Sequence, residues 1–156
     1  MYIKRTLENI VLETSKNFKI ILITGMRQVG KTTFLKNLEP KNRKYVTLDN
    51  PNDLIVAKSE SKFFLDMYSP PVLIDEIQYA PELFPYLKML ADNTTEKGII
   101  WMTGSQQFHL MKNVSESLAG RVAVINMCGF SIYERFNKGE LQKSYLPTSK
   151  APCILE

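Results

Sequence analysis

The sequence predicts an α/β fold of three layers, a parallel β-sheet with helices on both faces, and three observations favour it. Short apolar runs alternate with amphipathic segments along the chain, which is the order of repeated strand–helix units. Several of these runs are apolar at every position, as in strands that are buried on both faces. The stretch GMRQVGKTT, residues 25–33, joins one such run to a helical segment through a glycine-rich turn.

Length and composition indicate one globular unit. The chain has 156 residues, of which 44% are hydrophobic and 23% are charged, as in an ordinary folded domain. We expect residues 1–138 to form this domain, beginning with an amphipathic helix. Residues 139–156 contain two prolines and little periodicity, so we expect a linker or tail towards a C-terminal domain that this sequence lacks.

Charge and cysteine content narrow the function classes. The formal net charge is +4 and the basic residues are dispersed, which suits an anionic ligand and supports a nucleic-acid partner only weakly. Cys128 and Cys153 lack metal-ligand spacing, so neither a zinc site nor a disulfide framework is expected. No run of about 18 apolar residues occurs, so we expect no membrane span and a cytoplasmic location.

The first third of the chain predicts a helix and two strands around the glycine-rich turn. Apolar residues at helical spacing predict a packing helix, or one that contacts adenine or a neighbouring subunit: Ile3, Leu7, Ile10 and Val11. Residues 20–23 form the first predicted strand. Residues 45–48, with β-branched and aromatic side chains, form the second.

The middle of the chain predicts two helical regions and a short strand. Asn50 followed by Pro51 is a good helix opening, and the helix is expected to reach about residue 68 with a break near residue 59. Residues 72–74 are a short, fully apolar strand. Pro81 then starts the next helix.

The last third predicts two further strands and a helix. Residues 99–103 form the fourth strand, in which Trp101 is expected in the core. A polar segment that includes His109 as a loop residue leads to the fifth strand, residues 122–125. Ser131 is expected to cap a last helix that runs to about residue 138.

The glycine-rich turn matches the pattern G-x-x-x-x-G-K-[ST] of a phosphate-binding loop. Its two glycines permit turn conformations in which successive N–H groups point into one concavity, and the following helix adds its positive end. Lys31 would reach the β- and γ-phosphates of a nucleotide, and the Thr32 hydroxyl would bind Mg²⁺. Arg27 either contacts phosphate or pairs with an acid and braces the loop.

We therefore expect the loop as a whole to hold the nucleotide, with the Thr33 side chain turned away from the phosphates. The expected nucleotide-binding residues are Gly25, Arg27, Gln28, Val29, Gly30, Lys31, Thr32 and Thr33.

An acidic pair directly after the third predicted strand supplies two roles. Asp75 can hold Mg²⁺, directly or through water, and Glu76 can orient and polarise an attacking water. A glutamate beside the metal-holding aspartate suits hydrolysis by water, so the pair favours an ATPase over a small-molecule kinase.

Further candidates follow or precede other strands, and we expect those that follow a strand at the carboxyl edge of the sheet, where ligands bind in such folds. Ser105, or alternatively Gln106, can sense the γ-phosphate or position the water. Arg121 can supply positive charge to the γ-phosphate of a neighbouring subunit, or form a surface ion pair. Asp49 can interact with Glu76 or Mg²⁺.

With GMRQVGKTT, VLIDEIQ, TGSQ and SLAGRVAVI present in this order, residues 1–136 resemble a prokaryotic family of AAA-type P-loop ATPases. The resemblance implies a catalytic-glutamate ATPase core with sheet order 5-1-4-3-2. It also implies the usual roles for Lys31, Thr32, Asp75 and Glu76, and strengthens the role of Arg121. Members of the family continue into an uncharacterised C-terminal domain, so we expect the lid over the nucleotide to be missing here.

The leading hypothesis is an ATP-binding, Mg²⁺-dependent ATPase core whose hydrolysis drives a conformational change in another domain or a partner. The first alternative is a nucleotide-binding switch with negligible hydrolysis. The second is that ATP gates a contact with nucleic acid. A homo-oligomer in which Arg121 acts in trans is compatible with each of them.

Overall fold

A computed structural model describes residues 2–38, 42–105 and 108–136 of the chain. Within these ranges five strands form one sheet in the order β2-β3-β4-β1-β5, and all neighbouring strands pair in parallel. This is the predicted order 5-1-4-3-2, read here from β2 to β5, so the predicted fold is confirmed. The strands are β1 (Ile20–Gly25), β2 (Lys44–Thr47), β3 (Val72–Asp75), β4 (Ile100–Ser105) and β5 (Val122–Asn126).

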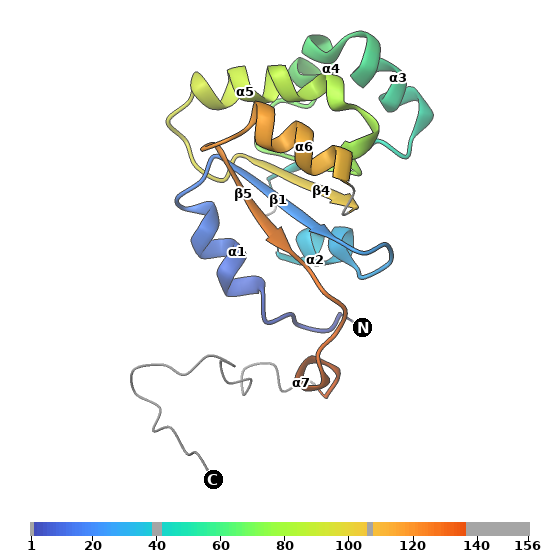
Figure 1. Ribbon diagram of the computed structural model, residues 1–156, viewed down its shortest axis with the longest axis vertical. Helices are drawn as coiled ribbons and strands as arrows, with labels where there is room; N and C mark the ends of the chain where they lie inside the picture. The colour runs from blue at the N-terminus through green and yellow to red at the C-terminus, as the bar shows by residue number, and fades with distance from the viewer. Residues whose placement is uncertain (1, 39–41, 106–107, 137–156) are drawn as a thin grey trace.

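The helices form a layer on each face of the sheet (Figure 1). One face is covered by α1 (Glu8–Ser15) and α2 (Lys31–Leu38). The other is covered by α3 (Pro51–Ser59), α4 (Ser61–Met67), α5 (Phe84–Asp92) and α6 (Phe108–Ser117). Two short 3-10 helices, Ile77–Tyr79 and Pro81–Leu83, precede α5, and the short helix α7 (Ile132–Arg135) follows β5.

Two hydrophobic clusters fill the spaces between the layers, and β1 contributes to both. Its alternate residues face opposite sides: Ile20 and Leu22 pack under α3 to α6, whereas Ile21 and Ile23 pack under α1 and α2. All six residues of β1 are buried. The uniformly apolar run in the sequence is therefore a central strand covered on both faces, as predicted.

Trp101 lies in the cluster under α1 and α2, only 1% exposed, as predicted. The guanidinium of Arg43 lies over its ring, 4.2 Å from the ring centroid. Such a cation–π contact places a charged group on an otherwise apolar surface at little desolvation cost.

The predicted break in the helical region after Asn50 is confirmed. The Asn50 side chain accepts a hydrogen bond from the Asn52 N–H at 3.1 Å, and Pro51 takes the first helical position. The helix stops before Glu60, whose backbone leaves the helical region with φ −133° and ψ 54°. Residues 51–67 therefore form two helices, α3 and α4.

The N-terminal helix differs from the prediction. It begins at Glu8, so Ile3 lies ahead of it in a segment that is neither helix nor strand, and Ile10 is 52% exposed. Val11 is buried as expected. Ile3 shares the apolar spacing of the helix but lies outside it, where it lines a pocket beside the glycine-rich loop.

The polar segment before β5 is helical and not a loop, which corrects the prediction for His109. Residues 108–117 form α6 because Leu110, Val114 and Leu118 recur every four residues and bury one stripe against the core. The last helix begins after Ser131 as predicted. Its end near residue 138 and the expected linker, residues 139–156, lie outside the described residues.

In the part of the chain that the structure describes, none of the helices has both the length and the apolar character needed to cross a bilayer.

The central position of β1 predicts how single truncations affect stability. Leu22→Ala removes a side chain that is 0% exposed, and we expect the free energy of unfolding to fall by about 2–5 kcal/mol. Val124 is paired with Leu22 across the β1–β5 ladder but is 40% exposed, so Val124→Ala should cost under about 1 kcal/mol. Urea denaturation of both variants would measure the difference. Equal losses of unfolding free energy would contradict the central, buried position of β1.

Candidate functional site

The glycine-rich loop joins the end of β1 to the start of α2, and its backbone is unusual. Gly25, Gln28 and Gly30 all take positive φ, at 150°, 63° and 89°. For Gln28 this left-handed conformation is uncommon and costs free energy, as is frequent in loops that bind ligands. The loop is thus held in one tight shape ahead of the N-terminus of α2.

The two glycines of the loop are required for different reasons. A Cβ at Gly25 would lie 2.2 Å from the carbonyl oxygen of Met127, in the segment after β5, so only glycine fits there. A Cβ at Gly30 would meet nothing within 4 Å, so the positive φ is what favours glycine at that position. The space beside Gly30 is open and can receive a ligand.

Lys31 is folded back onto its own loop. Its side chain is 5% exposed, and Nζ donates to the carbonyl oxygens of Met26, at 2.9 Å, and Gly25, at 3.3 Å. None of the ion pairs among the described residues includes Lys31. A buried ammonium group with only carbonyl partners is free to neutralise an anion that enters the loop.

Asp75, at the end of β3, collects three hydroxyl donors and is itself 5% exposed. Its Oδ1 accepts from Thr32 Oγ1 at 2.7 Å and from the hydroxyl of Thr103. Its Oδ2 accepts from the hydroxyl of Tyr45 at 3.2 Å. Carboxylate and hydroxyl oxygens at this spacing are the ligand type that Mg²⁺ prefers, so Thr32 and Asp75 fit the predicted metal site.

Tyr45, on β2, is a neutral donor in this cluster. Burial, followed by the nearby charge of Asp75, raises the pKa of its hydroxyl to about 12. The ammonium of Lys36 lies over its ring, 3.3 Å from the centroid, and holds the ring from outside. Tyr45 therefore fixes the orientation of the Asp75 carboxylate without competing for its charge.

Glu76 sits on a strained backbone at the same edge of the sheet. It adopts the left-handed conformation with φ 58°, and its N–H donates to Thr103 Oγ1 at 3.1 Å. Its carboxylate accepts from the side-chain amide of Gln78, whose Oε1 in turn accepts from the N–H of Ser105 at 3.2 Å. Gln78 thus connects the carboxylate of Glu76 to the end of β4.

The Ser105 hydroxyl, at the end of β4, is a further polar group of this edge. It is buried and has no hydrogen-bond partner among the described atoms. Buried hydroxyls without a partner are rare in folded proteins, so a ligand or a water is expected to complete it. The alternative residue at this position, Gln106, lies outside the described residues.

A pocket of about 270 Å³ lies beside the loop, between the N-terminal segment and the segment after β5. Its lining is mainly apolar and aromatic, and it includes the loop residues next to Gly30. The lining residues are Tyr2, Ile3, Arg5, Val29, Gly30, Thr33, Phe34, Met127 and Phe130. Thr33 therefore faces this pocket.

Arg27 and Asp49 are not bound into the site by the described contacts. Arg27 is exposed in the loop, and no described hydrogen bond or ion pair braces it. Asp49 is exposed beyond the end of β2, and its N–H donates to Thr47 Oγ1 at 3.2 Å. No described contact joins Asp49 to Glu76.

Arg121 directly precedes β5 and so lies at the amino ends of the strands, away from the candidates at the carboxyl edge. Its carbonyl accepts from the N–H of Ile20, the first residue of β1, at 3.3 Å. Its guanidinium pairs with Asp92 at 2.5 Å. Because β5 runs parallel to β1, a residue before β5 is separated from the loop by the length of β1, roughly 20 Å for six residues.

Sequence reasoning missed the residues that hold the site residues in place. Thr103 and Tyr45 reach Asp75 from neighbouring strands, Gln78 holds Glu76, and Arg5 lines the pocket. Gln78 was visible as the last residue of VLIDEIQ, directly after the acidic pair. Thr103 was visible in the same way, as the first residue of TGSQ. Tyr45 and Arg5 carry no local signal because their contacts join segments that are far apart in the sequence.

Known proteins resemble this chain over most of its length. A family model described as an AAA domain matches residues 17–136. Two uncharacterised proteins, one from Mycobacterium bovis and one from Mycobacterium tuberculosis, are each 35% identical to it over 114 residues. The aligned part is 72% of this chain and 26% of each relative, so the chain spans about a quarter of the length of the curated relatives it matches.

The contact between Gly25 and Met127 predicts a loss of stability on substitution. Gly25→Ala should lower the free energy of unfolding by more than the ~1–3 kcal/mol that a strained backbone conformation costs, because the new Cβ also meets a carbonyl oxygen. Gly120→Ala is the matched control, since its φ is +73° and its Cβ would meet nothing within 4 Å. Urea denaturation compares them, and equal losses would show that the loop moves aside without cost.

Proposed function

The chain belongs to the AAA domain family, and from this premise we propose that it binds ATP with Mg²⁺ and hydrolyses ATP to ADP and phosphate. Nucleotide binding is the general property of such domains. Hydrolysis, the identity of the nucleotide and the coupling to other parts of a protein are the further content of the proposal.

One observation supports the proposal most directly. The Thr32 hydroxyl, from the start of α2, and the Asp75 carboxylate, from the end of β3, meet at 2.7 Å beside the phosphate loop. These two residues would hold Mg²⁺, which when bound neutralises charge on the phosphates. Tyr45 and Thr103 would keep the Asp75 oxygens in position through their hydroxyl donors.

The loop and Lys31 would bind the phosphates. The loop N–H groups and the N-terminus of α2 favour anionic oxygens at the open space beside Gly30. The ammonium of Lys31 now satisfies itself on two carbonyl oxygens of the loop, and it would exchange these for the β- and γ-phosphate oxygens.

Glu76 is the proposed general base. Its carboxylate accepts a proton from a water whose oxygen attacks the γ-phosphorus, while the bond from that phosphorus to the bridging oxygen of ADP breaks. Gln78 holds the carboxylate, and the unpartnered hydroxyl of Ser105 would donate to a γ-phosphate oxygen or to the water. Proton acceptor and hydroxyl are then positioned before the reaction begins.

The pocket beside the loop is the proposed site of the adenine base. It is apolar and aromatic, and it adjoins Val29 and Gly30, where the phosphates would lie. Phe130 and Tyr2 offer ring faces on which a base can stack, and stacking of this kind contributes about 1–3 kcal/mol.

Hydrolysis is proposed to drive a conformational change in a further domain or a partner, within the longer proteins that this family includes. Arg121, at the far edge of the sheet, would act only on the nucleotide of a neighbouring chain. A nucleotide switch with negligible turnover is the alternative, and it is favoured if the Gln78 amide keeps the Glu76 carboxylate away from the water instead of orienting it.

Two substitutions separate binding from hydrolysis. Lys31→Ala should weaken ATP binding at least tenfold, because a buried positive charge beside the phosphates is lost. Glu76→Gln should retain ATP binding and slow phosphate release about 10²–10⁴-fold, because the general base is lost. Isothermal titration and a phosphate-release assay measure the two quantities.

Lys16→Ala and Glu13→Gln are the controls for these variants, since both residues lie in an exposed ion pair on α1. Neither should change affinity or rate. Equal phosphate release from the wild type and Glu76→Gln would overturn the catalytic assignment, and ATP binding without turnover in the wild type would support the switch instead.

The base pocket makes a separate prediction. Phe130→Ala should weaken ATP binding about tenfold and leave the affinity for inorganic triphosphate, which has no base, unchanged. Phe136→Ala is the matched control, because that ring is 72% exposed and does not line the pocket. A parallel loss of affinity for ATP and triphosphate in Phe130→Ala would place the base elsewhere.

A further inference from the structure

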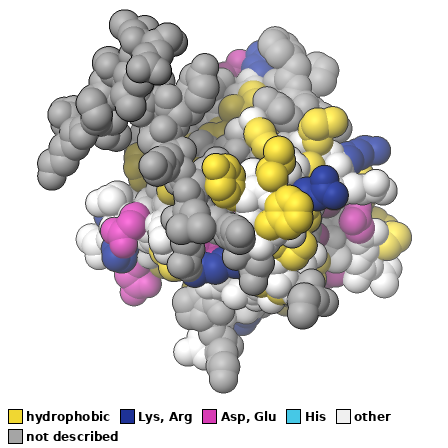
Figure 2. Space-filling view, turned by 90° about the horizontal axis from the view of Figure 1, so that it is seen from below, with side chains coloured by type: hydrophobic (Ala, Val, Ile, Leu, Met, Phe, Trp, Pro, Cys, Tyr) yellow, Lys and Arg dark blue, Asp and Glu magenta, His cyan; other side chains and the backbone are white. Residues whose placement is uncertain are grey.

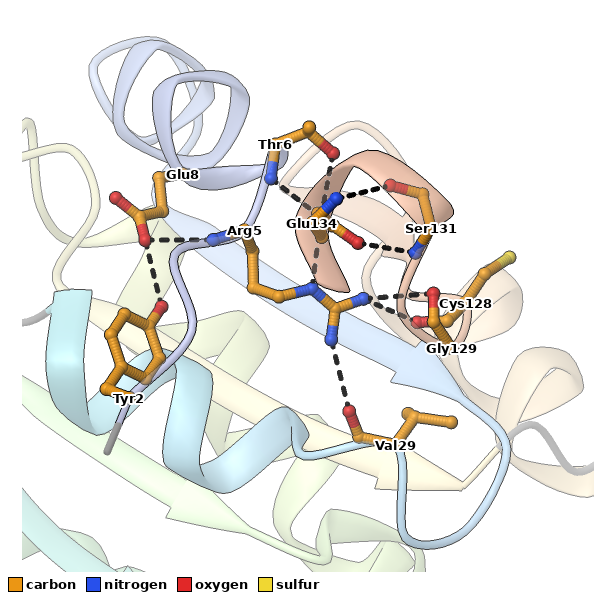
Figure 3. A network of polar contacts seen from close by, with 9 residues as sticks. All are labelled: Tyr2, Arg5, Thr6, Glu8, Val29, Cys128, Gly129, Ser131 and Glu134. Atoms are coloured by element: carbon orange, nitrogen blue, oxygen red, sulfur yellow. Dashed lines mark hydrogen bonds and ion pairs between the residues drawn. The ribbon is translucent and has the colours of Figure 1, made fainter. Parts of the chain in front are cut away.

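Arg5 joins three segments that are far apart in the sequence (Figure 3). It lies ahead of α1 and is 4% exposed. Its guanidinium donates to the carbonyl of Val29 in the phosphate loop at 3.3 Å and to that of Cys128 after β5 at 2.7 Å. Its Nε donates to Glu134 Oε1 on α7 at 3.1 Å.

Glu134 is as deeply buried as its partner, at 3% exposed. Its Oε1 also accepts from the N–H and the hydroxyl of Thr6, at 2.8 Å and 3.0 Å, and its Oε2 accepts from the N–H of Ser131 at 2.8 Å. Burial acts to raise the pKa of Glu134, but the hydrogen bonds from Thr6 and Ser131 and the charge of Arg5 hold it below its ordinary value. The carboxylate is therefore ionised and paired.

A buried ion pair of this kind is poorly explained by stability alone. Removing two charges from water costs several kcal/mol, and apolar residues of the same size often stabilise a fold as well. What such a pair supplies is a defined position for the segments that it joins, because neither charge can leave its partner inside the protein. Here the segments are the phosphate loop and α7.

The contact with Val29 fixes the direction of a peptide group in the loop. The peptide plane between Val29 and Gly30 is trans, so its N–H points away from its C=O. With the carbonyl of Val29 held by Arg5, the N–H of Gly30 points in the opposite direction within that plane, away from Arg5. Gly30 has φ +89° and few steric barriers, so without Arg5 this peptide could turn over.

Arg5 also contacts both walls of the pocket, one through its side chain and one through its backbone. Its guanidinium carbon lies 4.3 Å from the centroid of the Phe130 ring. Its backbone N–H donates to the Glu8 carboxylate at 3.1 Å, and the Tyr2 hydroxyl donates to the same carboxylate at 2.9 Å. Movement of α7 away from Arg5 and Thr6 would therefore disturb the contacts of Arg5 with the loop and with the pocket.

We propose that the Arg5–Glu134 pair couples the phosphate loop to α7, so that occupancy of the loop by nucleotide and docking of α7 stabilise each other; this inference rests on the proposed function. Coupling of this kind is reciprocal, since each bound state lowers the free energy of the other. The nucleotide state of the loop would thereby affect the docking of α7, the helix that follows β5.

The coupling would affect an exposed apolar surface on and near α7. Figure 2 views the molecule from the side on which α7 and the N-terminus lie in Figure 1, and hydrophobic side chains gather on this face. On α7 itself Ile132 is 72% exposed and Tyr133 is 48% exposed. A change in the docking of α7 would change how this apolar surface is presented.

The test uses the whole chain with ADP and Mg²⁺, so that hydrolysis plays no part. The variants are Arg5→Lys, which keeps the positive charge but loses the planar guanidinium with its several N–H donors, and Glu134→Gln, which keeps the shape and loses the negative charge. We expect each to weaken ADP binding about tenfold, and the double variant to be no worse than the single ones. Glu13→Gln, on the surface of α1, is the control and should bind ADP as the wild type does.

Hydrogen exchange supplies a readout that a merely structural role would not change. In the wild type ADP should increase the protection of the amides of α7, and in both variants this increase should be lost. Equal ADP affinity in the wild type and in either folded variant, or no effect of ADP on α7, would overturn the inference alone. No binding of ADP to the wild type would overturn the proposed function with it.

Discussion

The parallel hydrogen bonding of β1, to β4 on one side and to β5 on the other, is the constraint on which the rest of the structure depends. Because the strands all run the same way, the residues that follow β1, β3 and β4 meet at one edge of the sheet. Asp75 and Ser105 are the last residues of β3 and β4, and Lys31 opens the helix that the loop joins to the end of β1, so all three lie at this edge. The same rule keeps Arg121 at the opposite edge, because it precedes its strand.

Two buried carboxylates near the site are stabilised in different ways, and the difference matches their roles. Asp75 is surrounded by the hydroxyls of Thr32, Thr103 and Tyr45, which hold its orientation and leave its charge uncompensated. A carboxylate of that kind can still bind a cation. Glu134 is instead neutralised by Arg5 and bound by backbone N–H groups. Its charge therefore holds segments of the chain together and is not available to a cation.

The sequence was sufficient for those features that depend on residues close together in the chain. The loop and the pair Asp75–Glu76 could be identified because each follows an apolar strand directly, and strand order followed from the family resemblance. The contacts that hold the site could not be predicted, because Arg5 and Glu134 are 129 residues apart and Tyr45 reaches Asp75 only once β2 pairs with β3. Likewise α6 was missed, because its apolar stripe is narrow among polar residues.

The burial of Trp101 means that the intrinsic fluorescence of the chain can report on its core. It is the single tryptophan of the sequence, and it lies on β4 in the cluster that includes Phe34 and Leu35 of α2. Its intrinsic fluorescence therefore arises from one known place, the layer beneath the helix that begins at the phosphate loop. A shift of its emission to longer wavelength would report that water has entered this layer, without any label attached to the surface that α7 presents.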